Sequence, residues 1–388
     1  MSYFNWAAHS PPQVLVEGKE PVDWTELVAV AKGYIGELLG HNPRDVSLHH
    51  NTTAAFQRIV IRLRLYFEGL SPVLLITDQE YPGLVALLDE QWPGPIVMVS
   101  ISDCIWNGDV DKARERLNLA SRRYKPQVVL ISHVSRSSGL FFRDEWLSEM
   151  KECAPDALFI LDGAQAVGNV ELSGEVISRS DFYVFSGHKW LRGLPTLGIV
   201  VADQQKWSVD DPAQGYSVQV GSRGTGSERV LSSLIEGLQR LLGGDGRHCS
   251  AAAAMALKLA QKLVSAGLVP FGVSAADSWT WNGIVSVPID VRGGIRTAAA
   301  NLNYAYIEGE TFRSAEFGSA AAGPRFVLQF RQHVTSTEVR WKPTLVRVPS
   351  YCDVPVPLPA RGLARFCVSW DHTEDELQEL VARLAEEA

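Results

Sequence analysis

Apolar positions alternate between helical and strand-like spacing along the first two thirds of the chain. Residues Trp24–Leu39, Thr53–Phe67 and Leu84–Gln91 carry apolar side chains at helical spacing. Short apolar runs follow helical segments at Val73–Thr77, Val97–Ile101, Gln127–Ile131 and Leu158–Leu161. Buried strands that alternate with helices are typical of a mainly parallel sheet covered on both faces. We therefore expect an α/β fold here, with functional groups in the loops beyond the carboxyl ends of the strands.

The pattern changes after about residue 245. A long helix is predicted at about Ser250–Ala266, and the last helix at Thr373–Ala388. Strand-like pieces lie between them at Gly283–Ile289, Phe326–Phe330 and Thr344–Val348, whereas the periodicity is weak through residues 290–340. Because a single core stops growing at about 250–300 residues, a chain of 388 residues predicts two domains. We place a large domain at 21–248 and a smaller α+β domain at 249–388.

Composition and charge exclude several classes of protein. With 46% apolar and 21% charged residues, the chain is neither disordered, collagen-like nor a coiled coil. A net charge of −8 disfavours a nucleic-acid partner, which needs a basic face. The first residues lack the pattern of a signal peptide, and no run reaches the roughly 18 apolar residues of a membrane helix. The five cysteines show no CxxC spacing, which predicts a cytoplasmic enzyme with free thiols and no metal site.

A carboxylate and a lysine follow two neighbouring predicted strands. Leu158–Leu161 runs into Asp162, and the apolar-aromatic run Asp181–Phe185 leads through Ser-Gly-His to Lys189. In a parallel sheet both side chains face the same crevice. Pyridoxal phosphate chemistry needs this pair: a lysine amine holds the aldehyde as a Schiff base, and a carboxylate keeps the pyridine nitrogen protonated.

The strings DGAQ and SGHK resemble the class V aminotransferase branch of fold-type I pyridoxal-phosphate enzymes, which includes cysteine desulfurases, cysteine or cystine C–S lyases and isopenicillin N epimerases. The resemblance implies the family fold, with a mainly parallel seven-stranded sheet between helices and a smaller α+β domain. It also implies pyridoxal 5'-phosphate as the cofactor. It places Asp162 on the pyridine nitrogen, Gln165 on the ring hydroxyl, Ser186 and His188 on the phosphate, and Lys189 in the Schiff base.

The same resemblance implies further phosphate ligands and a dimer. Asn51-Thr52-Thr53 opens a helix, where hydroxyls and free N–H groups suit an anion, and the family holds the phosphate with this loop. Thr52 and Thr53 are therefore expected there. Thr225, in GSRGTGS, resembles a threonine that reaches the phosphate of the neighbouring subunit, which implies a homodimer with active sites at the interface.

Other positions are expected to contact the ring or the substrate. Tyr81 follows a buried strand where the family places an aromatic group over the pyridine ring, and its hydroxyl can lend a proton to a leaving sulfur. Arg365, in ARFCVSWDH, resembles the arginine that grips the substrate carboxylate, for which a planar guanidinium is suited. Residues Tyr3–Ser10 resemble a family segment near the substrate, which places His9 there and makes residues 1–20 an N-terminal segment beside the active site.

Two positions depart from the family pattern. Arg136 stands in His-Val-Ser-Arg where the family commonly has Asn on the ring hydroxyl. Its guanidinium either faces the substrate, where it can bind a second acidic group, or turns to solvent. Cys352 lies five residues after Arg347, which mirrors the loop of the sulfur-accepting cysteine in some desulfurases, although the flanking residues differ.

The matches around Tyr81, DGAQ, GHKW and Arg365 look most like the C–S lyases. They imply β-elimination on cysteine or an S-conjugated cysteine, with thiol, pyruvate and ammonia as products. The 11 tryptophans and the region 270–340, where the resemblance is lost, fit a pocket for a bulky S-substituent, as in secondary metabolism. Three alternatives remain open: a desulfurase that uses Cys352, an epimerase, aminotransferase or decarboxylating enzyme with the same cofactor residues, and a non-catalytic homologue.

Overall fold

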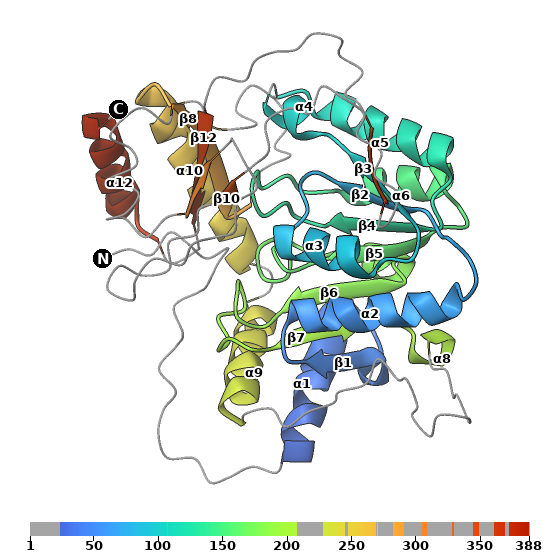
Figure 1. Cartoon of the computed structure of the whole chain (residues 1–388). Coiled ribbons are helices and arrows are strands. Elements are labelled where there is room, and N and C mark those ends of the chain that lie inside the picture. The colour runs from blue at the N-terminus through green and yellow to red at the C-terminus, as the bar shows by residue number, and fades with distance from the viewer. Residues whose placement is uncertain are drawn as a thin grey trace.

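The computed structural model describes residues 24–106, 108–207, 228–244, 247–268, 270, 282–290, 305–308, 328–329, 344–348, 361–368 and 372–387. Across these residues, one eight-stranded sheet forms the centre of the larger part of the molecule (Figure 1). Its strands follow in the order β1 (Val46–His49), β7 (Gly198–Val201), β6 (Phe182–Ser186), β5 (Leu158–Asp162), β4 (Val128–Ser132), β2 (Leu74–Thr77), β3 (Pro95–Val99) and β11 (Thr344–Val348). β7 is antiparallel to both of its neighbours, and the other adjoining pairs are parallel.

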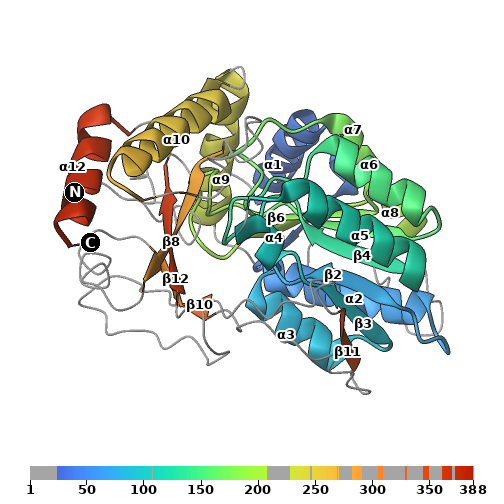
Figure 2. The same cartoon turned by 90° about the horizontal axis from the view of Figure 1, so that it is seen from above.

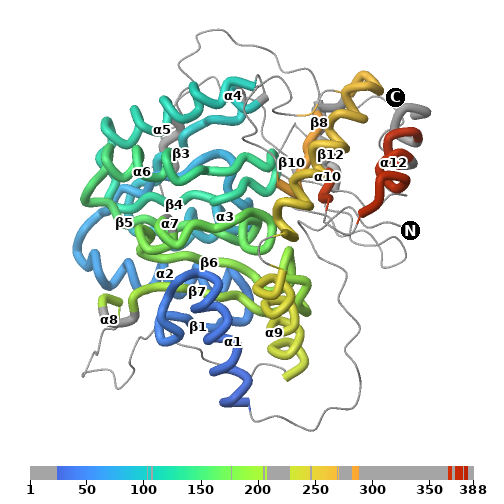
Figure 3. The backbone as a smooth tube through the Cα atoms, turned by 180° about the vertical axis from the view of Figure 1, so that it is seen from behind, coloured from blue at the N-terminus to red at the C-terminus, as the bar shows by residue number. Residues whose placement is uncertain are grey.

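Helices cover both faces of this sheet (Figure 2). One face carries α1 (Trp24–Leu39), α4 (Ser102–Trp106), α5 (Val110–Tyr124), α6 (Asp144–Cys153), α7 (Gly174–Arg179) and α9 (Glu228–Gly243). The other face carries α2 (Thr52–Tyr66), α3 (Pro82–Gln91) and α8 (Gln204–Trp207). The short 3-10 helix η1 (Pro43–Asp45) links α1 to β1, and α9 lies beside α1 (Figure 3). Within the described ranges, no helix has both the length and the apolar character needed to cross a lipid bilayer.

Strands β2 to β7 are largely apolar because each of them contributes side chains to two cores. In β5, Phe159 and Leu161 pack into the core on one face, whereas Leu158 and Ile160 pack into the core on the other. Successive side chains of a strand point to opposite faces. A sheet with helices on both sides therefore needs a continuous apolar run, which is the pattern seen in the sequence.

The smaller part of the molecule holds a second sheet, in the order β10 (Leu328–Gln329), β9 (Ala305–Glu308), β12 (Arg361–Cys367) and β8 (Ile284–Asp290). Helices α10 (Arg247–Ser265) and α12 (Glu374–Glu387) share a core with β8 and β12. A further apolar cluster joins the two parts, with Val134 and Trp190 from loops of the large sheet against Ile284 and Cys367. Both loops follow carboxyl ends of strands, so the smaller sheet meets the large one at that edge.

The predicted fold class is confirmed: a mainly parallel sheet lies between two layers of helices and is joined to a smaller α+β part. The predicted helices and strands agree with the structure to within a few residues. One strand differs in its place. Thr344–Val348 was assigned to the smaller domain, but as β11 it pairs with β3 and adds an eighth strand to the large sheet. The domain boundaries themselves remain predictions.

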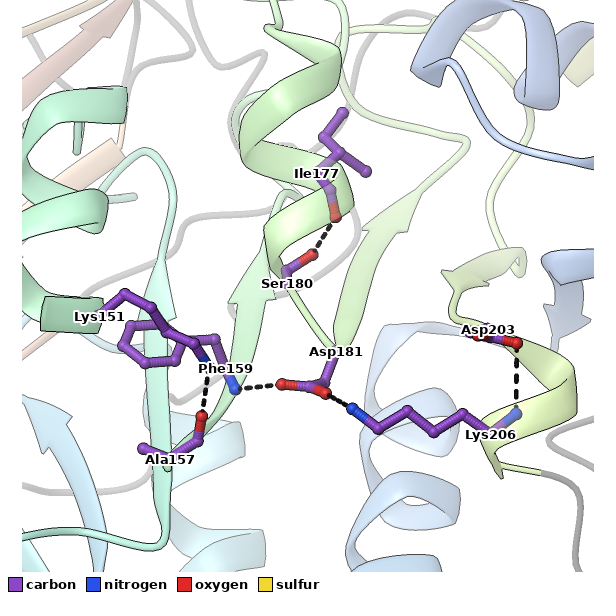
Figure 4. A network of polar contacts seen from close by, with 8 residues as sticks. All are labelled: Lys151, Ala157, Phe159, Ile177, Ser180, Asp181, Asp203 and Lys206. Atoms are coloured by element: carbon purple, nitrogen blue, oxygen red, sulfur yellow. Dashed lines mark hydrogen bonds and ion pairs between the residues drawn. The ribbon is translucent and has the colours of Figure 1, made fainter. Parts of the chain in front are cut away.

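The amino-terminal edge of the large sheet is held by a network of paired polar groups (Figure 4). Asp181, just before β6, accepts a hydrogen bond from the backbone N–H of Phe159 at 2.9 Å and forms an ion pair with Lys206. Lys151 donates to the carbonyl of Ala157 at 2.6 Å. These bonds join β5 and β6 to the helices around them, so they stabilise the fold.

Candidate active site

Three neighbouring parallel strands end side by side at the opposite, carboxyl edge. Ser132 at the end of β4 lies opposite Asp162 at the end of β5, and Asp162 lies opposite Val184, two residues before the end of β6. The loops that follow carry the segments 133–141, 163–170 and 187–194. The residues singled out around Asp162 and Lys189 are therefore gathered at one edge of the sheet.

Asp162 is a buried carboxylate, with 7% of its surface exposed. Its Oδ1 accepts a hydrogen bond from the backbone N–H of Ala164 at 2.9 Å. Burial raises the pKa of Asp162 above its ordinary value, while the positive charge of Lys189 and the bond from Ala164 act in the opposite direction. A buried carboxylate of this kind needs a cationic partner, and Lys189 is one such charge.

Lys189 lies in a tight turn that follows β6. The turn is closed by hydrogen bonds from Gly193 N to Gly187 O at 2.8 Å and from Arg192 N to Lys189 O at 2.9 Å. His188 and Lys189 are both partly buried. The structure therefore brings the predicted lysine and carboxylate together, and their predicted roles remain expectations.

Gln165 lies beside Asp162 and is held by Trp190. The indole N–H of Trp190 donates to Oε1 of Gln165 at 2.9 Å, and Gln165 is 3% exposed. Because an indole N–H is only a donor, Gln165 presents its oxygen to Trp190, and its amide nitrogen faces away. An amide N–H donor suits the predicted contact with a ring hydroxyl.

A candidate anion cradle lies where the end of β6 comes close to the start of α2. Ser186 pairs in register with Gly198 of β7, and a Cβ added to Gly198 would lie 2.3 Å from the backbone carbonyl of Asn51. Asn51 caps α2, since its Oδ1 accepts from Ala54 N at 2.8 Å. The absence of a side chain at Gly198 thus lets the start of α2, with the partly buried Thr52 and the exposed Thr53, come close to the end of β6.

The hydroxyl of Ser186 supports this assignment. Ser186 is 2% exposed, and its Oγ is buried with no hydrogen-bond partner among the residues that the structure describes. A buried hydroxyl normally has a partner, and a helix N-terminus favours an anion. The donors in this cradle therefore fit the phosphate of pyridoxal phosphate, with the partly buried His188 two residues further along the chain.

Tyr81 and Arg136 form a pair above the ends of β2 and β4. The guanidinium carbon of Arg136 lies 5.3 Å from the centroid of the Tyr81 ring, and Tyr81 is 42% exposed. Arg136 is half-buried. Arg136 thus contacts the residue that is predicted to stack over the pyridine ring.

A buried polar layer under this pair was missed by the sequence analysis. Glu80 accepts hydrogen bonds from Ser132 N at 2.8 Å, Ser132 Oγ at 2.6 Å and Thr77 Oγ1 at 2.7 Å. Burial raises the pKa of Glu80 to about 8, to which the charge of Asp162 contributes. The available signal was an acidic residue three positions after an apolar strand and directly before Tyr81.

His133 is a second residue that sequence reasoning left without a role. Its Nδ1 lies 3.0 Å from the hydroxyl of Tyr183, and burial lowers its pKa to about 4. Its Nε2 is buried with no hydrogen-bond partner within the described ranges. His133 therefore adds a neutral imidazole next to Asp162, whose carbonyl accepts from His133 N at 2.9 Å.

The remaining predicted residues are placed only in part. His9, Thr225 and Cys352 lie outside the described residues. Arg365 lies on β12, where its backbone is opposite Ser286 of β8. Ser286 donates to the carbonyl of Ser137 at 2.5 Å, so this position of β12 is one strand away from the loop that carries Arg136.

Two curated proteins match parts of the chain. A probable cysteine desulfurase of Pyrococcus abyssi is 31% identical over 86 residues, which cover 22% of this chain and 21% of the relative. Isopenicillin N epimerase of Amycolatopsis lactamdurans is 26% identical over 209 residues, 53% of this chain and 50% of the relative. The matched segments thus span about a fifth of the first relative and half of the second.

Solved structures match over the whole chain at low identity. The cystine C–S lyase C-DES, in complex with its reaction product cysteine persulfide, has a TM-score of 0.69 at 17% identity, with 100% of this chain and 97% of that chain covered. A mutant of C-DES with glycine covalently linked to the PLP cofactor has a TM-score of 0.67 at 16% identity, with coverage of 100% and 96%.

At these identities the likeness shows the fold. The family itself follows from the sequence, because the aminotransferase class-V profile matches residues 22–215, half of the chain and nearly all of the sheet that carries Asp162 and Lys189. This chain is a member of the aminotransferase class-V family.

Proposed function

We propose that the protein is a pyridoxal-phosphate-dependent C–S lyase that acts on cysteine or an S-substituted cysteine. The reaction consumes one water and releases the thiol, pyruvate and ammonium. The observation that carries this proposal is the buried Asp162 next to the charge of Lys189, at the edge of the sheet that also holds the Ser186 cradle. The full-length fold similarity to a cystine C–S lyase supports the choice of reaction.

Pyridoxal 5'-phosphate is the cofactor of this family, and the residues described above fit it. When bound, it supplies an electron sink for negative charge at the substrate Cα. Asp162 would hold a proton on the pyridine nitrogen, and the amide nitrogen of Gln165 would donate to the ring hydroxyl. Ser186 and His188, with the start of α2 at Thr52 and Thr53, would hold the phosphate.

Four further residues are assigned to the substrate. The amine of Lys189 would hold the cofactor aldehyde, and as a base it would take the proton from Cα of the substrate. The hydroxyl of Tyr81 lends a proton to the sulfur that leaves Cβ. We expect Arg365 to hold the α-carboxylate by two parallel hydrogen bonds, and His9 of the N-terminal segment to contact the substrate.

The assembly we propose is a homodimer. In this arrangement Thr225 of one protomer donates to the phosphate held by the other, so neither protomer alone has a complete cradle. The net charge of −8 supports a small-molecule substrate over nucleic acid, which needs a basic face, and we expect the enzyme to act in the cytoplasm.

Cysteine desulfuration is the second candidate, favoured by the 31% identical segment shared with a probable cysteine desulfurase. In that reaction the thiolate of Cys352 would take the substrate sulfur as a persulfide and alanine would be released. The two candidates thus differ in the fate of the carbon skeleton.

A product screen separates these functions. The loaded enzyme is incubated with cysteine, cystine and S-conjugated cysteines, and pyruvate, thiol, alanine and carbon dioxide are measured. We expect pyruvate in equal amounts with the sulfur compound that leaves Cβ, which is sulfide from cysteine, cysteine persulfide from cystine and a thiol from the S-conjugates. Both products should be lost in Lys189→Ala and kept in Cys352→Ala. Persulfide and alanine that disappear in Cys352→Ala would establish the desulfurase instead, and carbon dioxide would establish a decarboxylating enzyme.

A further inference from the structure

The strongest unassigned feature is the pair formed by Arg136 and Tyr81. A guanidinium over an aromatic face keeps its N–H donors at its edge, where they can meet a carboxylate in a bidentate pair. The 5.3 Å separation places Arg136 over the ring of Tyr81. Both residues follow carboxyl ends of strands, and β4 lies directly between β2 and the Asp162 strand β5. The pair therefore lies at the same edge as Asp162.

One buried residue holds both partners in place. The side-chain oxygen of Gln79 accepts from the hydroxyls of Ser135 at 3.0 Å, Ser137 at 3.2 Å and Ser138 at 3.0 Å. These serines surround Arg136 in the sequence and are 0–4% exposed. Gln79 itself is two residues before Tyr81 and 5% exposed. The loop of Arg136 and the loop of Tyr81 are thus fixed to one another by a buried amide.

The same loop is fixed to the smaller sheet. Ser286 of β8 donates to Ser137 O at 2.5 Å, and Asn282 donates to Gly139 O at 2.8 Å. Gly139 has a φ of +75° and lies so close to Ile284 O that a Cβ would be 2.8 Å away. Ser286 is the register partner of Arg365. The hydrogen bond from Ser286 to Ser137 thus links the loop that carries Arg136 to the strand that pairs with Arg365.

We propose that Arg136 recognises a second anionic group of the substrate, a carboxylate on the side chain of the amino acid. This inference rests on the proposed function, because it concerns the same site. A carboxylate that leaves water needs a cationic partner, and Arg365 is already assigned to the α-carboxylate. The substrate class is then an S-substituted cysteine whose sulfur substituent carries a carboxylate. Gln79 is a positioning residue for this recognition.

A matched pair of ligands tests the proposal with the loaded enzyme. S-(carboxymethyl)-L-cysteine and S-(carbamoylmethyl)-L-cysteine have almost the same shape and differ in one negative charge. Their dissociation constants are measured from the change in cofactor absorbance, and pyruvate is measured separately. We expect the wild type to prefer the carboxylate by about tenfold to about a hundredfold, the usual effect of a charge-assisted hydrogen bond.

Variants assign the preference to Arg136. Arg136→Gln should bind the two ligands equally, Arg136→Lys should keep part of the preference, and Arg122→Gln, on the exposed end of α5, should behave as the wild type. An intact cofactor absorbance shows that each variant is folded, and if Arg136→Gln does not fold, the ligand pair on wild type and Arg136→Lys decides.

Each outcome separates this inference from the proposed function. Equal binding of both ligands by the wild type, a preference that survives in Arg136→Gln, or no binding of either ligand overturns the role of Arg136, even if cysteine yields pyruvate. A preference that depends on Arg136, without pyruvate from any substrate, supports the role of Arg136 and overturns the C–S lyase.

Discussion

At the scale of single residues, Asp162 is the group on which the proposed chemistry depends. Its burial favours the neutral acid, whereas Lys189 and the N–H of Ala164 favour the carboxylate. A cationic ring nitrogen above it would add to the second effect. The carboxylate is therefore best stabilised when the cofactor is present, which links its charge to its function.

Replacing this carboxylate by an amide should separate catalysis from binding. We expect Asp162→Asn to keep the cofactor through the phosphate cradle and to lose kcat by about 10²–10³, a usual effect of removing one electrostatic contact. Steady-state kinetics measures kcat, and cofactor absorbance measures how much cofactor stays bound. Asp181→Asn is the matched control, because Asp181 lies at the amino-terminal edge of the same sheet (Figure 4). Asp181→Asn should lower the free energy of unfolding by about 1–3 kcal/mol and leave kcat unchanged. A kcat for Asp162→Asn equal to that of the wild type would contradict the role assigned to Asp162.

Glu80 predicts a pH dependence of stability. Its pKa rises from 4.5 to about 8 on folding, so between these values the folded protein keeps a proton that the unfolded chain has lost. The free energy of unfolding of the wild type should therefore fall as pH rises through this window, by up to about 1.4 kcal/mol per pH unit. Glu80→Gln lacks this titration, so its free energy of unfolding should rise relative to that of the wild type as the pH increases from about 4.5 to about 8. Urea unfolding at several pH values tests this, and parallel curves for the two proteins would show that Glu80 does not titrate in this window.

At the scale of elements, the site depends on how closely α2 approaches β7. The start of α2 lies against Gly198 because Gly198 has no side chain, and Ser186 lies opposite Gly198 in the register. In the proposed enzyme a short strand and a capped helix therefore form one anion site together. Neither forms it alone.

A methyl group at Gly198 should open this cradle. Its Cβ would lie 2.3 Å from the Asn51 carbonyl, so Gly198→Ala must displace the start of α2. We expect the affinity of the apoprotein for pyridoxal phosphate to fall by about tenfold or more, equivalent to at least ~1.4 kcal/mol, as measured by titration of the cofactor. Gly33→Ala on α1 meets no atom within 4 Å and should keep the affinity while gaining about 0.5–1 kcal/mol of stability. Unchanged affinity in Gly198→Ala would show that the phosphate lies elsewhere.

The sequence predicts elements well where the reason is local. Runs such as Leu158–Leu161 are apolar because both faces are covered, and the end of such a run marks the position of Asp162. The place of β11 could not be predicted in this way, since its partner β3 is about 250 residues away in the chain. Glu80 and Gln79 were missed for the same reason, because their partners lie 52 to 59 residues later in the chain. These partners are Ser132 at the end of β4 and Ser135, Ser137 and Ser138 in the loop after it.

At the scale of the whole molecule, the two sheets and a second protomer together complete the proposed site. The apolar cluster around Trp190 and Ile284 joins the sheets at the carboxyl edge. Arg365 is brought to this edge by β12 of the smaller sheet, and Thr225 is expected from the partner. The proposed lyase is therefore a property of the dimer.

Mixed dimers test this arrangement. We expect a particle of about 85 kDa, twice the 42.6 kDa of one chain, by light scattering. Lys189→Ala and Thr225→Ala should each be impaired alone. A heterodimer of the two has one site with both residues intact, so a pure heterodimer should have up to about half of the wild-type activity. After random exchange of a 1:1 mixture about half of the dimers are heterodimers, so the mixture should reach up to about a quarter of it. A monomer, or mixtures no more active than their components, would contradict shared sites.

The most direct test of the account is the identity of the lysine that holds the cofactor. The loaded protein is reduced with borohydride, digested and analysed by mass spectrometry. We predict a pyridoxyl group on Lys189 and none in Lys189→Ala. A colourless protein that takes up no vitamer, or an adduct on another lysine, would contradict the account.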